Sequence, residues 1–330
     1  MKNLKLKSTL LFLLTAVAFT LYITGCNQNS ITNPGSQSDD EYLQSVVQAG
    51  YNGGNDRTVE DNLISNTIND MDTGAVGDDG GYNIPIAHLI RWGRHITDVN
   101  VNLSISNQGD TMKNVAVTRT ITGFYRIIGI DQTGHQIEID KPYVEVTNRN
   151  VAFKRVAKNV QPRFNWRVYS VSVLNGKTTS PTPVNTVTMN SIVITDISSG
   201  QTITLNGPDF TQNVFYTKLF GGAGVPKFDR GDQIKIDVYV TSTTSDTNII
   251  DWHWARNTFG FHRIPFMIKS NVPGVGGYSQ VYERTFNIYN YHLLGQYNTY
   301  ISANTKESLW DDDPAKFNSV EAGIPYRVTR

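Results

Sequence analysis

The chain has 330 residues, of which 39% are hydrophobic, 11% aromatic and 18% charged, and this composition can support a packed core. Basic and acidic residues balance at 29 each, and removing the first 25 residues leaves 26 basic against 29 acidic, a net charge of −3. A general nucleic-acid-binding protein would normally show a basic face. The charge balance therefore argues against nucleic acid as a partner.

Residues 1–25 have the organisation of a bacterial signal peptide. Lys2, Lys5 and Lys7 precede the apolar run LLFLLTAVAFTLYI. A run of about 14 apolar residues is too short to span a bilayer comfortably and matches the apolar region of a signal peptide. We therefore expect this leader to be removed from the mature protein.

The leader ends in ITGC, from Ile23 to Cys26, and this sequence resembles the lipobox of bacterial lipoproteins. The resemblance implies cleavage before Cys26, attachment of diacylglycerol to its sulfur, and acylation of the new amino terminus. Asn27 follows, which by resemblance to the sorting rule of enteric bacteria favours the outer membrane of a Gram-negative bacterium. The alternative is an ordinary secreted protein with a stray cysteine. Cys26 is the single cysteine, so no disulfide framework is available to the fold.

Residues 26–83 predict an acidic, flexible tether with a short helix. The segment 27–40 has no apolar periodicity and is typical of a linker. The sequence EYLQSVVQAG, residues 41–50, predicts a brief amphipathic helical turn, and residues 58–71 predict a helix that opens with a capping box from Thr58 to Asp61.

From residue 84 onward the hydrophobic period changes to two, which predicts β-strands. In DVNVNLSIS, for example, Val99, Val101, Leu103 and Ile105 share one face. Sequences such as LNGKTTSPTP indicate turns between the strands. We predict an all-β fold with two Ig-like antiparallel β-sandwich units, 84–206 and 207–330, and one larger sandwich is the alternative. The predicted strands are 98–106, 114–130, 135–139, 143–147, 164–174, 185–197, 201–205, 233–245, 248–257, 262–270, 279–290 and 298–305.

The sequence DWHWARNTFGFHR, residues 251–263, carries the most distinctive side chains. Strand alternation places Trp252 and Trp254 on one face, where they fill a sandwich core or stack against sugar rings. Core packing is the usual use of such a pair. Asp251, His253 and His262 form a metal site only if a turn brings them together.

Two acidic segments resemble loops that bind Ca²⁺, a cation that prefers six to eight oxygen ligands. The first is DMDTGAVGDDGG, with Asp70, Asp72, Asp78 and Asp79, and the second is LWDDDP, with Asp311, Asp312 and Asp313. Neither has the residue order of an EF-hand, and each is more often a solvated turn.

Three function classes follow from these features. We expect a lipid-anchored cell-envelope protein that acts as a binding or structural module, without catalytic activity, and whose partner beyond the membrane is a protein or a polysaccharide. One alternative is a carbohydrate-binding surface lipoprotein that uses Trp252 and Trp254. The other is an envelope hydrolase with an unrecognised carboxylate pair, although no G-x-S-x-G, H-E-x-x-H or P-loop sequence is present.

Overall fold

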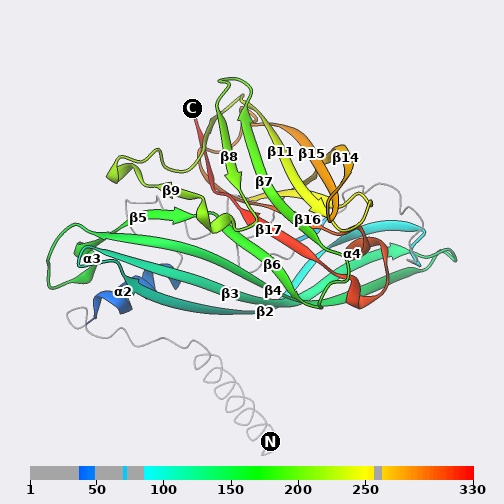
Figure 1. Cartoon of the computed structure of the whole chain (residues 1–330), viewed down its shortest axis with the longest axis horizontal. Coiled ribbons are helices and arrows are strands. Elements are labelled where there is room, and N and C mark those ends of the chain that lie inside the picture. The colour runs from blue at the N-terminus through cyan, green and yellow to red at the C-terminus, as the bar shows by residue number, and fades with distance from the viewer. Residues whose placement is uncertain (1–36, 49–69, 73–84, 256–261) are drawn as a thin grey trace, which may run out of the picture.

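The computed structural model describes residues 37–48, 70–72, 85–255 and 262–330, and shows an all-β fold built from two sheets (Figure 1). The predicted all-β class is therefore confirmed. Cys26, the leader, the predicted helix at 58–71 apart from residues 70 and 71, and Asp78 and Asp79 lie outside the described residues.

The larger sheet has 13 strands. Its main path contains β1 (Asp70–Asp72), β2 (His88–Asn107), β3 (Met112–Ile130), β4 (Gln136–Arg155), β6 (Leu174–Ser180), β17 (Ser319–Gly323), β16 (Gly295–Asn304), β12 (Ile249–Ala255) and β13 (His262–Pro265), in that order. The branches are β5 (Trp166–Ser172), β9 (Val214–Tyr216), β10 (Lys227–Asp229) and β18 (Tyr326–Thr329).

The smaller sheet has five strands in the order β14 (Met267–Gly274), β15 (Gly277–Asn287), β11 (Gln233–Ser242), β7 (Val187–Asp196) and β8 (Thr202–Asn206). Each sheet draws strands from both sides of residue 206. The smaller sheet packs on β12, β16, β17 and β18 through the largest apolar cluster, which includes Ile236, Val238, Trp252, Phe286 and Ile301.

Alternating side chains explain why β2, β3 and β4 are so long. Met112 pairs with Lys154 and Ile130 with Gln136, so β3 and β4 are in register along their whole common length. The predicted face of Val99, Val101, Leu103 and Ile105 is partly buried, while the residues between them are exposed. Period-two burial along most of β3 and β4, and along the second half of β2, is typical of strands that cover a core on one side.

The larger sheet curls until its two ends meet. Arg263 on β13 donates from Nη2 to the carbonyl oxygen of Trp92 on β2 at 3.3 Å, and its guanidinium lies 3.4 Å from the centre of the Trp92 ring. The inner face of β12, β16 and β17 consequently faces that of β2, β3 and β4. The strands β12, β16 and β17 are buried on both faces at most of their described positions.

Short helices close the open ends. The helix α2 (Asp39–Gln48) begins with a capping box, in which Ser38 N donates to Glu41 Oε2 and Glu41 N donates to Ser38 Oγ. Leu43 and Val47 bury against β3, β4 and β5. The others are α3 (Pro162–Asn165), α4 (Lys306–Trp310), η1 (Phe210–Gln212), η2 (Lys218–Phe220) and η3 (Pro314–Lys316). Within the described ranges, no helix has the length and apolar character needed to cross a membrane.

Candidate functional site

The strand β12 places Trp252 in the core rather than on the surface. Its side chain is 5% exposed, packs edge-on against Phe286 at 4.0 Å between ring centres, and donates its indole N–H to Thr299. Trp254 lies 5.4 Å from Trp252 and is partly buried against the same cluster. A sugar-stacking platform needs two accessible ring faces, and Trp252 offers none.

The opposite face of β12 is polar and equally buried. His253 stacks on Tyr300, with 4.1 Å between ring centres and 2° between planes, and its Nε2 lies 3.0 Å from Ser302 Oγ. Asp251 is buried beside it on the same strand face. Among the residues that the structure describes, no three His, Cys, Asp or Glu side chains are grouped to hold a metal ion.

The acidic segment LWDDDP surrounds a buried lysine. Lys141 on β4 is fully buried and donates from Nζ to the carbonyl oxygen of Glu307 at 2.8 Å. Burial lowers its pKa to about 8, against the opposing attraction of Asp311, Asp313 and Asp312. Asp311 Oδ1 and Asp313 Oδ1 also accept backbone N–H groups at 2.9 Å. These carboxylates therefore cap a turn, and their attraction partly opposes the effect of burial on Lys141.

The first acidic segment is only partly described. Asp70 and Asp72 belong to β1, which pairs with β2 so that Asp70 lies opposite Arg94 and Asp72 opposite Trp92. Backbone pairing of this kind makes Asp70–Asp72 an edge strand of the larger sheet.

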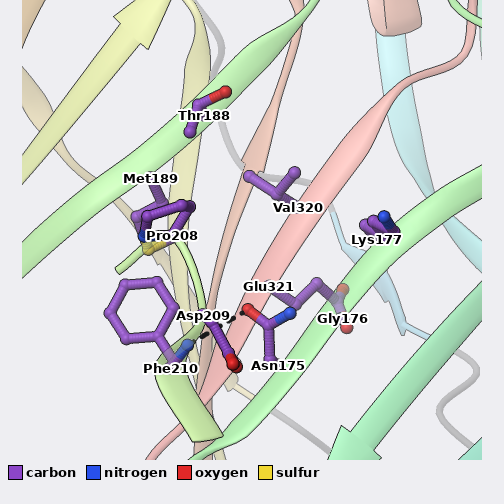
Figure 2. A pocket seen from close by; sticks show the side chains of 10 residues that line it. All are labelled: Asn175, Gly176, Lys177, Thr188, Met189, Pro208, Asp209, Phe210, Val320 and Glu321. Carbon is purple, nitrogen blue, oxygen red and sulfur yellow. Dashed lines mark hydrogen bonds between the residues drawn. The ribbon is translucent and has the colours of Figure 1, made fainter. Parts of the chain in front are cut away.

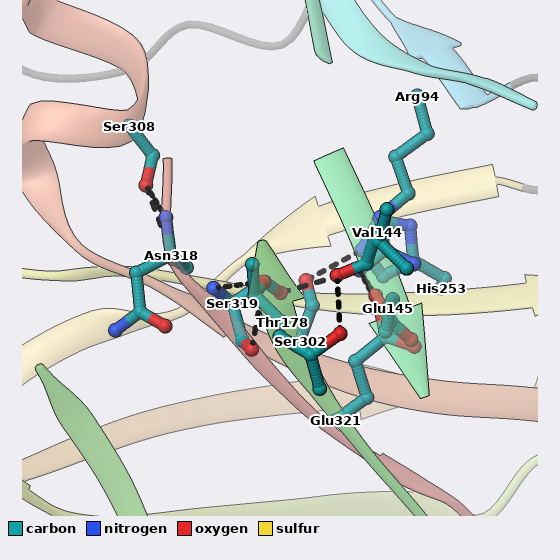
Figure 3. Close-up of polar contacts among 11 residues, drawn as sticks. Arg94, Val144, Glu145, Thr178, His253, Ser302, Ser308, Asn318, Ser319 and Glu321 are labelled. Atoms are coloured by element: carbon teal, nitrogen blue, oxygen red, sulfur yellow. Dashed lines mark hydrogen bonds and ion pairs between the residues drawn. The ribbon is translucent and has the colours of Figure 1, made fainter. Parts of the chain in front are cut away.

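A buried ion cluster occupies the interior of the curled sheet (Figure 3). Arg94 on β2 forms ion pairs with Glu145 on β4, at 3.1 Å, and with Glu321 on β17. Its guanidinium also donates to Ser319 Oγ at 3.2 Å and lies 5.8 Å from the ring centres of Tyr143 and Tyr300. One cation thus joins three strands that are not neighbours in the sheet.

Gly176 lies beside Glu145 and Glu321 and leaves space for their side chains. A Cβ atom at position 176 would come within 3.0 Å of Glu145 Oε1 and 3.2 Å of Glu321 Cβ. Burial raises the pKa of Glu145, and attraction to Arg94 opposes that shift. A carboxyl group with a raised pKa beside a second carboxylate is an arrangement that acid–base catalysis uses.

Both carboxylates of the cluster are buried, however. Glu145 is 0% and Glu321 2% exposed. A cavity of about 300 Å³ lies nearby between β6, β7, β17 and the segment that leads into η1 (Figure 2). Its lining includes Lys177, Phe210 and Val320, and also Gly176 and Glu321. The cavity therefore borders Glu321 of the cluster, whereas Glu145 does not line it.

An exposed aromatic pair lies on the connection between β15 and β16. Tyr289 is 48% and Tyr291 76% exposed, and their rings are parallel within 5° with centres 5.2 Å apart. Tyr289 is edge-on to His292 at 5.3 Å, and Arg230 Nε donates to the carbonyl oxygen of His292 at 2.6 Å. These contacts hold the tyrosine pair in a fixed geometry.

Strand prediction extended the preceding strand to residue 290, three residues beyond its end at Asn287. The spacing Tyr-x-Tyr in NIYNYH is the sequence feature that could have indicated this exposed pair. Aromatic residues that follow the end of a strand have no sheet to pack on. We found no protein-family model, no curated protein and no solved structure that matches this chain. Its function must therefore be argued from its own residues.

Proposed function

We propose that this protein is a lipid-anchored component of the bacterial cell envelope that acts as a binding or structural module. The observation that carries the proposal is the sequence ITGC at the end of a basic and apolar leader. Two acyl chains or more are needed for stable anchoring, because a single chain gives only marginal membrane binding. Diacylglycerol on the sulfur of Cys26, with an acyl group on its amino terminus, would meet that requirement.

The test is the fate of a Cys26→Ala variant expressed in a Gram-negative host. The unaltered chain should fractionate with membranes, and its intact mass should exceed that of residues 26–330 by the mass of the acyl groups. The variant should lose both properties. A Cys26→Ala chain that keeps an unchanged membrane fraction, together with an unaltered chain that shows no mass gain, would contradict the proposal.

A second candidate function is polysaccharide binding by Tyr289 and Tyr291. Exposed aromatic rings in a fixed orientation offer a flat apolar surface to the C–H face of a sugar ring at little entropic cost. This candidate moves the carbohydrate site from Trp252 and Trp254 to the tyrosine pair.

Retention on insoluble polysaccharide and on isolated peptidoglycan sacculi would test it. Tyr291→Ala should weaken binding about tenfold, since one stacking ring contributes on the order of 1 kcal/mol or slightly more. Tyr239→Ala, which removes a partly exposed tyrosine of β11, is the matched control and should bind normally. Equal binding by the two variants would exclude the tyrosine pair as the site.

A further inference from the structure

The end of the molecule that carries α2 combines exposed apolar side chains with basic ones. The connection between β4 and β5 exposes Val160 at 83%, Val156 at 48% and Phe164 at 44%. The adjoining segment 214–220 exposes Tyr216 and Leu219. We call these two segments, 154–167 and 214–220, the tether-end face. Single exposed apolar residues are ordinary, but several grouped on one end mark an interaction surface.

The tether-end face is basic throughout. The two segments contain six basic residues and no acidic one: Lys154, Arg155, Lys158, Arg163, Arg167 and Lys218. Lys158 and Arg163 are exposed. Among the six, Arg155 pairs with Asp39 of α2 at 3.5 Å. The remaining cations leave this surface positively charged in a chain with a small negative net charge.

Side-chain contacts hold the two segments together. The ammonium of Lys154 lies 5.6 Å from the ring centre of Tyr169 and 5.2 Å from that of Phe220. Thr217 donates from Oγ1 to the carbonyl oxygen of Val168 at 3.1 Å. Arg163 lies over the ring of Phe164 at 4.7 Å. This arrangement resembles an interfacial anchor, in which aromatic and aliphatic groups enter the headgroup region and cations remain at its surface.

The position of α2 relates this face to the lipid anchor. Asp39 follows Cys26 by 13 residues, which reach at most about 45 Å when fully extended. Lys113 pairs with Asp40, so α2 is fixed at the end of the long strands where β3 begins and β4 ends. Figure 1 shows α2, α3, β5 and β9 together at this end. The opposite end of β3 lies about 60 Å away at the usual rise per residue.

We infer that the tether-end face docks on an anionic lipid bilayer surface and fixes the orientation of the body on the membrane. This inference rests on the proposed lipid anchor, which would hold the face within reach of the bilayer. A basic surface near anionic lipid gains about fivefold in partitioning for each Lys or Arg. The exposed Val160 and Phe164 would add apolar burial at the interface.

The absence of a second cysteine makes a direct test possible. Val160→Cys in the mature acylated chain provides a thiol for an environment-sensitive fluorophore, because the sulfur of Cys26 is then a thioether. The chain is reconstituted in vesicles of phosphatidylcholine with or without phosphatidylglycerol. Val275→Cys, at a fully exposed position in the turn between β14 and β15, is the matched control.

Docking predicts a blue-shifted emission at position 160, and quenching by brominated lipids, only in vesicles that contain phosphatidylglycerol. Position 275 should report water in both. Adding Lys158→Glu and Arg163→Glu should reduce the docked fraction at least tenfold. Arg91→Glu with Lys177→Glu, which reverses the same charge at exposed positions on β2 and β6, should leave it unchanged.

The outcomes separate failure of docking from failure of the anchor. If the chain stays with the vesicles but position 160 reports water, docking is overturned and the anchor stands. If the chain leaves the vesicles and the thiol-reactive fluorophore also labels Cys26, the proposed lipid anchor is refuted, and the docking inference that rests on it is refuted too. Burial of position 160 in native membranes but not in lipid vesicles would assign the face to a protein and overturn the lipid assignment. Equal burial in the charge-reversed chain would also overturn it.

Discussion

Replacing Arg94 by methionine should destabilise the fold, because it removes the cation from the buried ion cluster. Arg94 is buried and forms ion pairs with Glu145 and Glu321. A charge pair at 3.1 Å is worth about 5 kcal/mol at an effective dielectric constant of 20, before desolvation is subtracted. Removing one partner of a buried pair generally costs about 3–5 kcal/mol. We expect a loss of that size in the free energy of unfolding at pH 7.

The pH dependence of this loss follows from the buried carboxylate of Glu145. Without Arg94 it can become neutral by binding a proton, which at pH 7 costs about 3.4 kcal/mol for a group whose ordinary pKa is 4.5, and about 0.7 kcal/mol at pH 5. Burial raises the folded-state pKa of Glu145 above its unfolded value, so the folded state binds more protons between the two values. Stability is therefore regained as the pH falls. The defect of Arg94→Met should shrink by about 2–3 kcal/mol between pH 7 and pH 5.

Urea unfolding of the mature chain in non-ionic micelles, followed by tryptophan fluorescence, measures these differences. Glu145→Gln leaves one cation with one carboxylate, Glu321, and should cost less than about 1.5 kcal/mol at pH 7. Arg91→Met removes an exposed arginine of the same strand and should change stability by no more than about 0.5 kcal/mol. The reasoning is refuted if Arg94→Met costs under about 1 kcal/mol, or if its cost is the same at pH 5 and pH 7.

Two further stability changes follow from the same region. Lys141→Met should raise the free energy of unfolding at pH 7 by about 1–3 kcal/mol. The folded-state pKa of Lys141 is lowered to about 8 from 10.5, so the stability of the unaltered chain rises as the pH increases between those values. The stability advantage of the variant in urea titrations should therefore be smaller at pH 10 than at pH 7. A stability difference that does not change with pH would contradict this. Gly176→Ala should cost about 1–3 kcal/mol, since its methyl group would press on Glu145 and Glu321; an unchanged urea midpoint would show that the two carboxylates separate freely.

Period-two patterning predicted β3 almost over its full length, at 114–130, because that strand covers a core on one side. It found only 98–106 of β2, and it divided β4 into 135–139 and 143–147 and missed the rest of that strand. It failed where the sheet is buried on both sides. The segment LNGKTTSPTP was interpreted as a turn because of its Gly, Lys and Pro residues, yet residues 174–180 form β6, near the middle of the larger sheet. A glycine is needed at position 176 because a Cβ atom there would crowd Glu145 and Glu321. The neighbouring residues in the sequence give no indication of this steric requirement.

The ion cluster could not be predicted for a related reason. In YVEVT, alternation would place Val144 and Val146 inside, but the structure buries Tyr143, Glu145 and Thr147 and leaves the valines partly exposed. The partner that makes burial of Glu145 tolerable is Arg94, two strands away. Similarly, SVEAG lies beyond the last predicted strand, 298–305, yet it forms β17, whose Glu321 completes the cluster. A buried charge is tolerated only beside an oppositely charged partner. Because the partners here are far apart in the sequence, local patterns cannot predict the pairing.

Burial also decides where function is to be sought in this molecule. Several ionisable side chains that could take part in catalysis are buried within the curled sheet and expose almost no atoms to solvent. They are Glu145, Glu321, Asp251 and His253. A search based on perturbed pKa values alone would select Glu145. Burial argues against that selection, since Glu145 is 0% exposed and does not line the nearby cavity. The features that can meet a partner are instead the fixed tyrosine pair on the connection between β15 and β16 and the basic face beside α2. The lipid-anchored binding module proposed above would use both.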